Sequence, residues 1–151
     1  RLIEGIGLQR EEVFVTNIVK CRPPDNRDPE AAEIEACSDY LSRQIELMDP
    51  EAIITLGRFS MNHFLPGERI SRIHGSSHEV DGRIIIAMYH PAASLHQPSL
   101  ADTLAKDFRQ IPEVVAAAHA QADPARPSDP ESGSDTEPNS ESDDPRQLTL
   151  F

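Results

Sequence analysis

The sequence lacks the features that mark a membrane protein, a zinc protein or a repeat protein. No apolar run approaches the roughly 20 residues that a membrane-spanning helix needs, and no basic start followed by a cleavage site indicates a signal peptide. The only two cysteines, Cys21 and Cys37, do not form the C-x-x-C pair of strong zinc motifs, and no internal repeat is visible. We therefore expect a cytoplasmic protein that does not act on membranes.

Positive charge is also scarce. The 151 residues carry a net charge of -12, and eight of the 26 acidic residues lie after position 122, against two of the 14 basic ones. Residues 1–122 therefore keep a net charge of -6. This balance argues against a broad nucleic-acid-binding patch, although Lys20, Arg22 and Arg27 form a local basic cluster in the sequence.

The residues after position 122 differ in composition from the rest of the chain. They are rich in acidic residues, proline and serine, and they cannot bury enough apolar surface to offset the entropy of an ordered chain. The composition predicts a folded domain over residues 1–121, a disordered acidic Pro/Ser-rich linker over residues 122–146 and a short apolar peptide over residues 147–151. The chain begins at Arg1 and not at a methionine, so we expect the N-terminal part of the domain to be missing.

Short apolar runs alternate with helical patterns in the folded part. Three runs predict strands: Val13–Thr16, Ala52–Leu56 and Arg83–Met88, the last joined to residues 78–80 by an Asp81–Gly82 hairpin turn. Apolar residues at helical spacing predict a helix that starts at Asp28 and Pro29, a brief helix near residues 59–65, and a last helix from Ser99 that Pro112 kinks or interrupts. This order predicts an α/β protein of three α/β/α layers with a central parallel sheet.

Two polar residues follow predicted strands, where ligands bind in such folds. Asn17 follows the first strand and His90 the third, and the carboxyl ends of strands in an open α/β sheet can face one crevice. A histidine before a proline is more often a capping or packing residue, but its place after a strongly apolar strand favours a proton donor or hydrogen-bond donor. His74 and His78 are predicted to be ordinary loop residues.

The two cysteines also have two interpretations. Cys37 lies on the apolar face of its predicted helix and is most simply a structural thiol. Cys21 lies between Lys20 and Arg22, whose charges favour the thiolate form that binds metals. The residues alone leave both interpretations open.

A series of motifs then occurs in order along the chain. The motifs are Thr16–Pro24 with Asn26–Pro29, then Glu35–Cys37, Ile54–Gly57 and Tyr89–Ala92. Together they resemble the family 4 uracil-DNA glycosylases, the iron-sulphur type, from about Leu2 to Ile111. The resemblance implies the uracil-DNA glycosylase fold and an enzyme that hydrolyses the N-glycosidic bond of uracil in DNA, which initiates base-excision repair.

The resemblance implies roles for four residues. Cys21 and Cys37 match two of the four thiolate ligands of a structural 4Fe-4S cluster. Asn17 matches the residue that reads the uracil edge, because an amide can donate to O4 and accept from N3–H, whereas cytosine presents the reverse pattern. His90 matches the catalytic residue that hydrogen-bonds uracil O2 while negative charge builds up on the departing base.

The same resemblance implies that these residues lack part of the site. In the family, the other two cysteines and a Gly-acidic-Ala-Pro-Gly loop for the attacking water belong to segments that would precede Arg1, so we expect the 151 residues alone to be inactive. After the His90 motif the family often has a Leu-Arg pair in a loop that presses into DNA, whereas this chain has Leu95 and His96. Leu95 keeps the apolar wedge, and His96 is a weaker phosphate partner at neutral pH.

The last five residues resemble the peptide Gln-Leu-x-Leu-Phe that binds the bacterial sliding clamp. Leu148 matches the second position, Leu150 and Phe151 would fill an apolar pocket of the clamp, and Gln147 would hydrogen-bond at its edge. The preceding linker would act as a tether that raises the effective concentration of the protein near DNA.

The implied partners are therefore uracil-containing DNA and a sliding clamp, and the protein is expected to act as a monomer. Two alternatives remain open from the sequence. One is a non-catalytic module that binds nucleic acid or the clamp on the same scaffold. The other is a glycosylase of the same superfamily with a different base preference.

Overall fold

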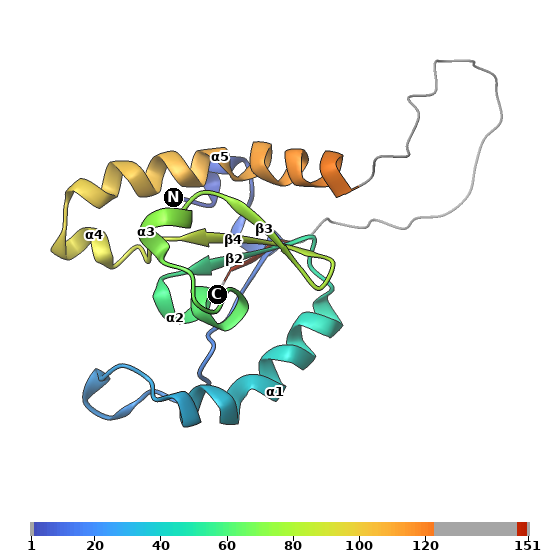
Figure 1. The fold of residues 1–151 in the computed structure, drawn as a ribbon. Coiled ribbons are helices and arrows are strands. Elements are labelled where there is room, and N and C mark those ends of the chain that lie inside the picture. The colour runs from blue at the N-terminus through green and yellow to red at the C-terminus, as the bar shows by residue number, and fades with distance from the viewer. Residues whose placement is uncertain (1, 123–147, 151) are drawn as a thin grey trace, which may run out of the picture.

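A five-stranded sheet forms the centre of the computed structural model, which describes residues 2–122 and 148–150 (Figure 1). The strand order is β1-β5-β2-β4-β3. The strands are β1 (Val13–Val15), β2 (Ala52–Leu56), β3 (Ser77–Val80), β4 (Arg83–Met88) and β5 (Leu148–Leu150). The strands predicted from the three apolar runs are confirmed as β1, β2 and β4, to within one residue.

The sheet is mixed, because β3 runs antiparallel to β4 while the other neighbouring strands are parallel. The predicted parallel pairing is confirmed for β2 and β4, and the predicted hairpin is confirmed by the antiparallel pair of β3 and β4. The exception follows from the turn that joins β3 to β4. Asp81 and Gly82 adopt φ values of 51° and 74°, as a two-residue hairpin turn requires, and so tight a turn joins only antiparallel strands.

Helices cover both faces of the sheet (Figure 1). α5 (Ser99–Ala122) crosses one face together with the 3-10 turn η1 (Glu4–Ile6). The other face carries α1 (Ala31–Met48), α2 (Arg58–Phe64) and α3 (Ile70–Ile73). The short elements η2 (Arg10–Glu12), η3 (Pro24–Asn26) and α4 (Ala93–His96) lie in the connections. The α/β class with helices on both faces is confirmed, and no helix in the described part of the chain is long and apolar enough to cross a membrane.

Alternate residues of the inner strands point to opposite faces, which divides the core in two. Ile54 and Ile86 pack toward α5, where they meet Phe108, whereas Ile53 and Ile85 pack toward α1, α2 and α3. All five side chains are buried. Burial on both faces explains why β2 and β4 are nearly continuous apolar runs and not alternating ones.

Helix α1 begins two residues later than the sequence pattern predicts. The pattern predicts Asp28 as the N-cap, but the N-cap is Glu30, whose backbone N–H donates to the Glu33 carboxylate at 2.9 Å. Asp28 forms an ion pair with Arg58 at the start of α2. The capping box of Glu30 and Glu33 begins the helix at Ala31, while the Asp28 carboxylate is engaged by Arg58.

Helix α5 continues through Pro112 to Ala122, so of the two predicted outcomes, a kink or an interruption, the interruption does not occur. A proline inside a helix removes one backbone N–H and crowds the preceding turn, at a cost of about 3 kcal/mol. Phe108 and Ile111 before the proline and Val115 after it are all buried against the sheet. Packing on both sides of Pro112 offsets this cost and holds the helix together.

Strand β5 comes from the C-terminal end of the chain and lies between β1 and β2, parallel to both. Leu148 pairs with Val13 and Ala52, so these three residues complete the middle of the sheet. The sequence analysis did not predict a strand here. Of the predicted linker, Ala122 closes α5 and residues 123–146 lie outside the described residues, as do Gln147 and Phe151.

Candidate active site

The carboxyl ends of β1, β2 and β4 lie at one edge of the sheet, as parallel strands require. Asn17 lies two residues beyond β1, Gly57 directly follows β2, and His90 lies two residues beyond β4. The strands β5 and β2 separate β1 from β4, which at about 4.8 Å per step puts those two strands roughly 14 Å apart. The two predicted site residues therefore follow strands whose carboxyl ends lie on the same side of the sheet.

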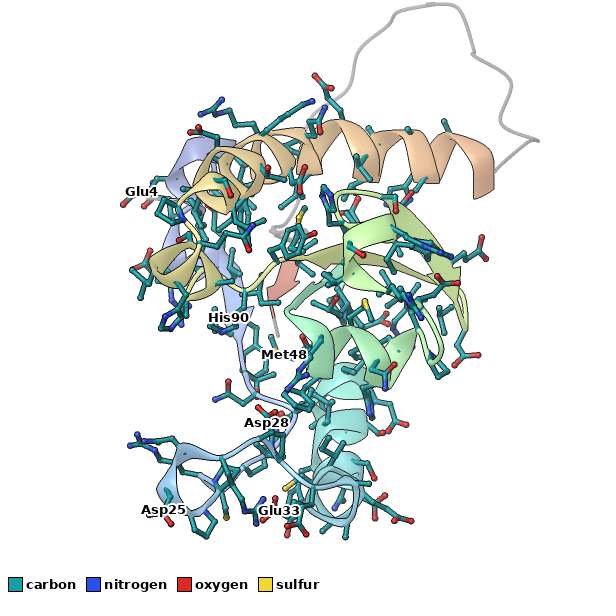
Figure 2. The ribbon with its side chains drawn as sticks, turned by 60° about the vertical axis from the view of Figure 1, so that its left-hand side comes forward. Glu4, Asp25, Asp28, Glu33, Met48 and His90 are labelled. Carbon is teal, nitrogen blue, oxygen red and sulfur yellow. The ribbon has the colours of Figure 1, made fainter. Side chains whose placement is uncertain are left out.

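The His90 side chain is exposed, but a backbone group orients its ring (Figure 2). The N–H of Ala92 donates a hydrogen bond to Nδ1 of His90 at 3.1 Å. Because Nδ1 accepts this bond, the neutral ring carries its proton on Nε2. His90 is thus a hydrogen-bond donor through Nε2 before any ligand arrives.

Gly57 makes a close contact with the same side chain. It adopts φ 88° and ψ 177°, a conformation that is essentially restricted to glycine. A Cβ atom at this position would lie 3.1 Å from Cβ of His90 and 3.8 Å from its ring atoms. The N–H of Gly57 donates to the carbonyl of Met88 at 2.8 Å, which ties the end of β2 to the end of β4. The absent side chain therefore makes room for His90.

Asn17 is held in a different way. Its side chain is exposed, while the next residue, Ile18, is 7% exposed and packs into the core beside α1. The ammonium of Lys20 donates to three oxygens: the Asn17 carbonyl at 2.7 Å, Thr16 Oγ1 at 2.9 Å and Gln44 Oε1 at 2.6 Å. Lys20 thus ties the loop that carries Asn17 to helix α1.

Both cysteines are associated with the loop that carries Asn17: Cys21 lies in the loop, and Cys37 on α1 contacts it. Cys21 is exposed in the loop after β1, and Cys37 is half-buried near the start of α1. The backbone N–H of Lys20 donates to Sγ of Cys37 at 3.3 Å, a contact of the kind made to metal-bound thiolates. Burial lowers the pKa of Lys20, and the charge of Cys37 partly opposes that shift. Within residues 2–122 and 148–150 no group of three or more metal-binding side chains occurs.

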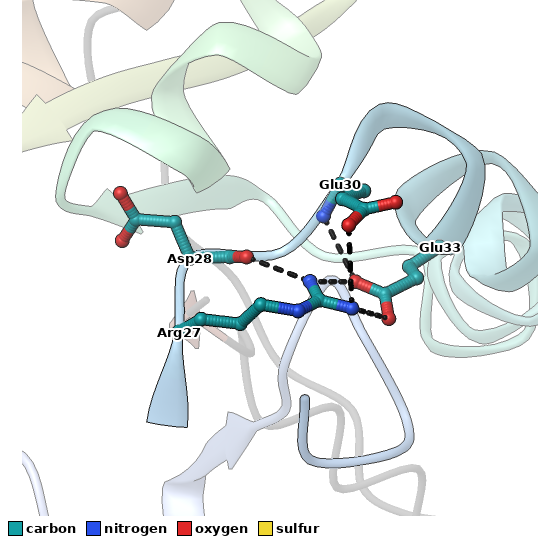
Figure 3. A network of polar contacts seen from close by, with 4 residues as sticks. All are labelled: Arg27, Asp28, Glu30 and Glu33. Atoms are coloured by element: carbon teal, nitrogen blue, oxygen red, sulfur yellow. Dashed lines mark hydrogen bonds and ion pairs between the residues drawn. The ribbon is translucent and has the colours of Figure 1, made fainter. Parts of the chain in front are cut away.

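The arginines near the cysteines are engaged within the protein. Arg27 donates to the two carboxylate oxygens of Glu33 at 2.8 and 2.9 Å (Figure 3). This pairing raises the pKa of Arg27 and lowers the pKa of Glu33. Arg22 in turn donates to the side chain of Asn26. The arginines of the local basic cluster therefore brace their own loop.

Helix α4 carries the two residues that the resemblance relates to DNA. Leu95 and His96 belong to α4, which begins three residues after His90. Both side chains are exposed, and Leu95 has 80% of its surface in solvent. The connection after β4 therefore presents His90 and an exposed apolar side chain within six residues of each other.

Sequence reasoning missed three residues that hold the site. Gly57 looks like a simple strand end in the sequence, and its need for a positive φ and for space beside His90 appears only in the fold. The sequence places Lys20 in a basic cluster and beside Cys21, and it gives no sign of the bond from Lys20 to the Asn17 carbonyl. Gln44 lies in the middle of α1, and only the packing of that helix brings it to Lys20.

A small apolar hollow lies elsewhere, on the α5 face of the sheet. Its lining side chains are all apolar: Ile3, Ile6, Leu8, Val13, Ile54, Phe108 and Ile111. Such a lining offers no donor or acceptor for the edge of a base. The edge that carries Asn17 and His90 is therefore the better candidate site.

Comparison with known proteins agrees with this geometry. Residues 1–115 match the family model of the uracil DNA glycosylase superfamily. The chain belongs to this superfamily. The matched residues include Asn17, both cysteines and His90, and the match confirms the resemblance that the motifs indicate.

Curated relatives of this uracil-DNA glycosylase superfamily member include three type-4 uracil-DNA glycosylases. The one from Saccharolobus solfataricus is 47% identical over 125 residues, 76% of this chain and 58% of the relative. The one from Archaeoglobus fulgidus is 46% identical over 122 residues, 75% of this chain and 61% of the relative. The one from Sulfurisphaera tokodaii is 46% identical over 121 residues, 74% of this chain and 55% of the relative. The chain thus spans slightly more than half the length of these relatives, and the identities support its assignment to type 4.

Proposed function

We propose that the protein is a uracil-DNA glycosylase, which cleaves the bond between uracil and deoxyribose and so initiates base-excision repair. Superfamily membership and the type-4 relatives support the proposal. The observation that carries it is the position of Asn17 and of an oriented His90 on one edge of the sheet. Because a base inside a duplex is out of reach, the nucleotide must leave the stack and enter this site.

In this mechanism His90 donates a hydrogen bond from Nε2 to O2 of uracil. Bond cleavage leaves cationic character on the sugar and negative charge on the base, so a fixed donor at O2 stabilises the transition state more than the bound substrate. The bond from the Ala92 N–H to Nδ1 sets the tautomer in advance. No proton therefore has to move before His90 can donate.

Asn17 reads the base through its side-chain amide. The amide donates to O4 of uracil and accepts from N3–H, and cytosine offers the reverse pattern at both positions. The discrimination depends on how the amide is aimed, and hence on the backbone from which it projects. Lys20 holds that backbone by its hydrogen bond to the Asn17 carbonyl.

Leu95 and His96 contact the DNA around the flipped nucleotide. Leu95 enters the base stack as an apolar wedge, which suits its exposure on α4. Unstacking one step costs a few kcal/mol, and an inserted side chain recovers part of that cost. His96 contacts a phosphate and is a weak partner for it at neutral pH.

Release of uracil from an oligonucleotide with a single uracil tests the activity, using the intact gene product. His90→Ala should lower kcat about 100- to 1,000-fold, because it removes a donor to developing charge. His119→Ala is the matched control: His119 lies on α5 and pairs with Glu51 before β2, at the opposite edge of the sheet, and its loss should leave the rate unchanged. No uracil release by the intact protein, or equal rates for both variants, would reject the mechanism.

Cys21 and Cys37 are proposed as two thiolate ligands of a 4Fe-4S cluster, in which the cluster joins the loop after β1 to helix α1. Cysteine thiolates are the usual ligands of such clusters, and the N–H of Lys20 supplies a hydrogen bond to one of the sulfurs. The intact gene product should then contain iron and sulfide and absorb visible light. Cys21→Ser should lose these signals and Ser38→Ala should keep them. A colourless protein that contains zinc would contradict this assignment.

Residues 147–151 are proposed as a peptide that binds a bacterial sliding clamp, and the support for this comes from the sequence alone. Leu148 and Leu150 belong to β5, whose backbone pairs with β1 and β2. A strand paired on both sides cannot enter another protein at the same time, so clamp binding requires β5 to leave the sheet.

Substitutions outside β5 test clamp binding without removing a strand. Gln147→Ala and Phe151→Ala should each weaken retention on an immobilised clamp about tenfold, the effect expected for a central contact residue. The control, Thr149→Ser, is a conservative change within β5 at the variable position of the peptide and should retain binding. Uracil release from short DNA should be the same for all three variants. Equal retention of the three variants on the immobilised clamp would contradict the proposal that residues 147–151 bind the clamp.

A further inference from the structure

A buried polar pair lies beside the carboxyl end of β4 and has no part in the mechanism above. Asp107 on α5 is 6% exposed, between Leu104 and Phe108 of the apolar core. Its Oδ2 lies 2.7 Å from Nδ1 of His74, the residue that follows α3. An unpaired carboxylate at this depth would be strongly unfavourable, so His74 compensates for its burial. The sequence-based interpretation of His74 as an ordinary loop residue is therefore wrong.

Gly75 holds the loop that carries His74 against strand β4. It has φ 76°, and a Cβ atom on it would lie 3.0 Å from Oδ1 of Asp107. Its N–H donates to the carbonyl of Ala87 at 2.8 Å, which fixes the loop against β4. A glycine at this position therefore leaves room for the carboxyl group and holds His74 next to the end of β4.

The His74 ring also contacts the residue before His90. The ring centroids of His74 and Tyr89 are 4.8 Å apart, with an angle of 39° between the ring planes. Tyr89 is half-buried and packs against the core on the α5 face. Because Nδ1 of His74 is committed to Asp107, the ring has a fixed plane to present to Tyr89. Tyr89 is thus held between the core and His74.

We propose that His74 is a positioning residue for the donor to the base. Asp107 fixes the His74 ring, the ring fixes Tyr89, and Tyr89 fixes the backbone from which His90 projects. The inference rests on the proposed function, since it takes His90 as that donor. A displacement of a catalytic group by about 1 Å can cost two orders of magnitude in rate. Loss of the ring contact should therefore lower turnover and leave DNA binding intact.

Two substitutions separate the ring contact from the pair with Asp107. His74→Asn keeps an N–H donor near the position of Nδ1 and removes the ring, whereas Tyr89→Leu removes the ring on the other side and leaves the pair with Asp107 in place. The matched control is His78→Asn, because His78 lies on β3 and bonds to Ser76. Both site variants should lower kcat about tenfold with KM within about twofold, and the control should change neither.

A double-mutant cycle tests whether the effect passes through His90. In a His90→Ala background, His74→Asn should cause no further loss of kcat, because the residue that it positions is gone. A second loss of about tenfold in that background would overturn the inference. So would a rise in KM at unchanged kcat, which would indicate a contact with DNA.

NMR of the ligand-free protein provides a readout that does not need activity. His74→Asn and Tyr89→Leu should each shift the ring signals of His90, and His78→Asn should leave them in place. Unchanged His90 signals in both site variants would overturn the positioning role even in a protein that releases uracil. Shifted signals in a protein that releases no uracil would support the positioning role and reject the proposed function.

Discussion

The two ends of the candidate active site are held by different forces. At the His90 end, the side chain lies close to Gly57, and its ring accepts a hydrogen bond from the Ala92 N–H. The preceding residue, Tyr89, packs against the core on the α5 face, and all of these residues follow the inner strands β2 and β4. At the Asn17 end, β1 has three residues, and Val15 keeps 44% of its surface in solvent. There the loop beyond the strand is tied by the Lys20 ammonium.

This difference separates the part of the site that sets the rate from the part that selects the base. Burying a large aliphatic side chain contributes roughly 1.5–3 kcal/mol, whereas a hydrogen bond contributes about 0.5–1.5 kcal/mol net. We therefore expect the apolar core to preorganise His90, where charge builds up. We expect the aim of Asn17 to depend on Lys20 and on whatever binds Cys21 and Cys37.

The largest expected effect comes from the core beneath His90. Ile86 on β4 is fully buried, so Ile86→Ala should lower the free energy of unfolding by about 2–5 kcal/mol. Val15→Ala at the exposed end of β1 should cost less than about 1 kcal/mol. Urea unfolding followed by circular dichroism measures both. Equal losses of unfolding free energy for Ile86→Ala and Val15→Ala would contradict the proposed difference between the His90 end and the Asn17 end of the site.

The close contact at Gly57 should have the next largest effect. Gly57→Ala forces an alanine into a glycine-only conformation and against His90, so we expect a loss of about 1–3 kcal/mol in unfolding free energy and about tenfold in uracil release. Gly82→Ala is the matched control, because Gly82 also has a positive φ but no atom within 4 Å of an added Cβ. Gly82→Ala should lower the free energy of unfolding and leave the rate of uracil release unchanged. A rate loss in both variants would show that backbone strain alone is responsible.

Removing the ammonium that holds Asn17 should have a moderate effect. Lys20→Met loses the bonds to Asn17, Thr16 and Gln44, and we expect kcat/KM for uracil to fall about fivefold, which corresponds to about 1 kcal/mol. Lys106→Met, on the exposed side of α5, is the control for loss of a positive charge. Steady-state kinetics on a short oligonucleotide at fixed salt compares the two. A larger loss at Lys106 would point to a general charge effect.

The smallest effect is expected at the ion pair that braces the loop. Arg27 lowers the pKa of Glu33 below its ordinary value of 4.5, so the stabilisation from this pair is fully present above pH 4.5 and is lost as the pH falls through the lowered pKa. Glu33→Gln should therefore lower the melting temperature slightly at pH 7. At a pH below the lowered pKa of Glu33 the substitution should leave the melting temperature unchanged. Both partners are partly exposed, which keeps the effect small. A constant difference in melting temperature between Glu33→Gln and the unsubstituted protein at all pH values would contradict the assignment.

The inner strands and the two site residues could be predicted because their signals are local. Ala52–Leu56 and Arg83–Met88 are short apolar runs, and such runs can be buried on both faces only as inner strands. A polar residue directly after such a strand lies at the carboxyl edge of the sheet wherever the helices pack. This is why the places of Asn17 and His90 beyond β1 and β4 could be predicted from the sequence, while their roles stay predictions.

The elements that differ from prediction all depend on a partner far away in the chain. Asp28 is an ideal cap by its sequence, but Arg58 takes up its carboxylate. The sequence pattern predicts that Pro112 kinks or interrupts α5, and the helix continues because the sheet packs against it on both sides of the proline. Strand β5 has only three residues, and it becomes a strand because β1 and β2 pair with it.

The sequence by itself determined the superfamily, the inner strands and the positions of Asn17, His90 and the two cysteines. Only the tertiary structure decided how those residues are held: Gly57 against His90, Lys20 against Gln44, and Asp107 through His74 and Tyr89. The reason is physical. Apolar periodicity is read within one segment, whereas a hydrogen bond or a ring contact needs two segments within a few ångströms of each other, and that distance is set by the packing of the whole core.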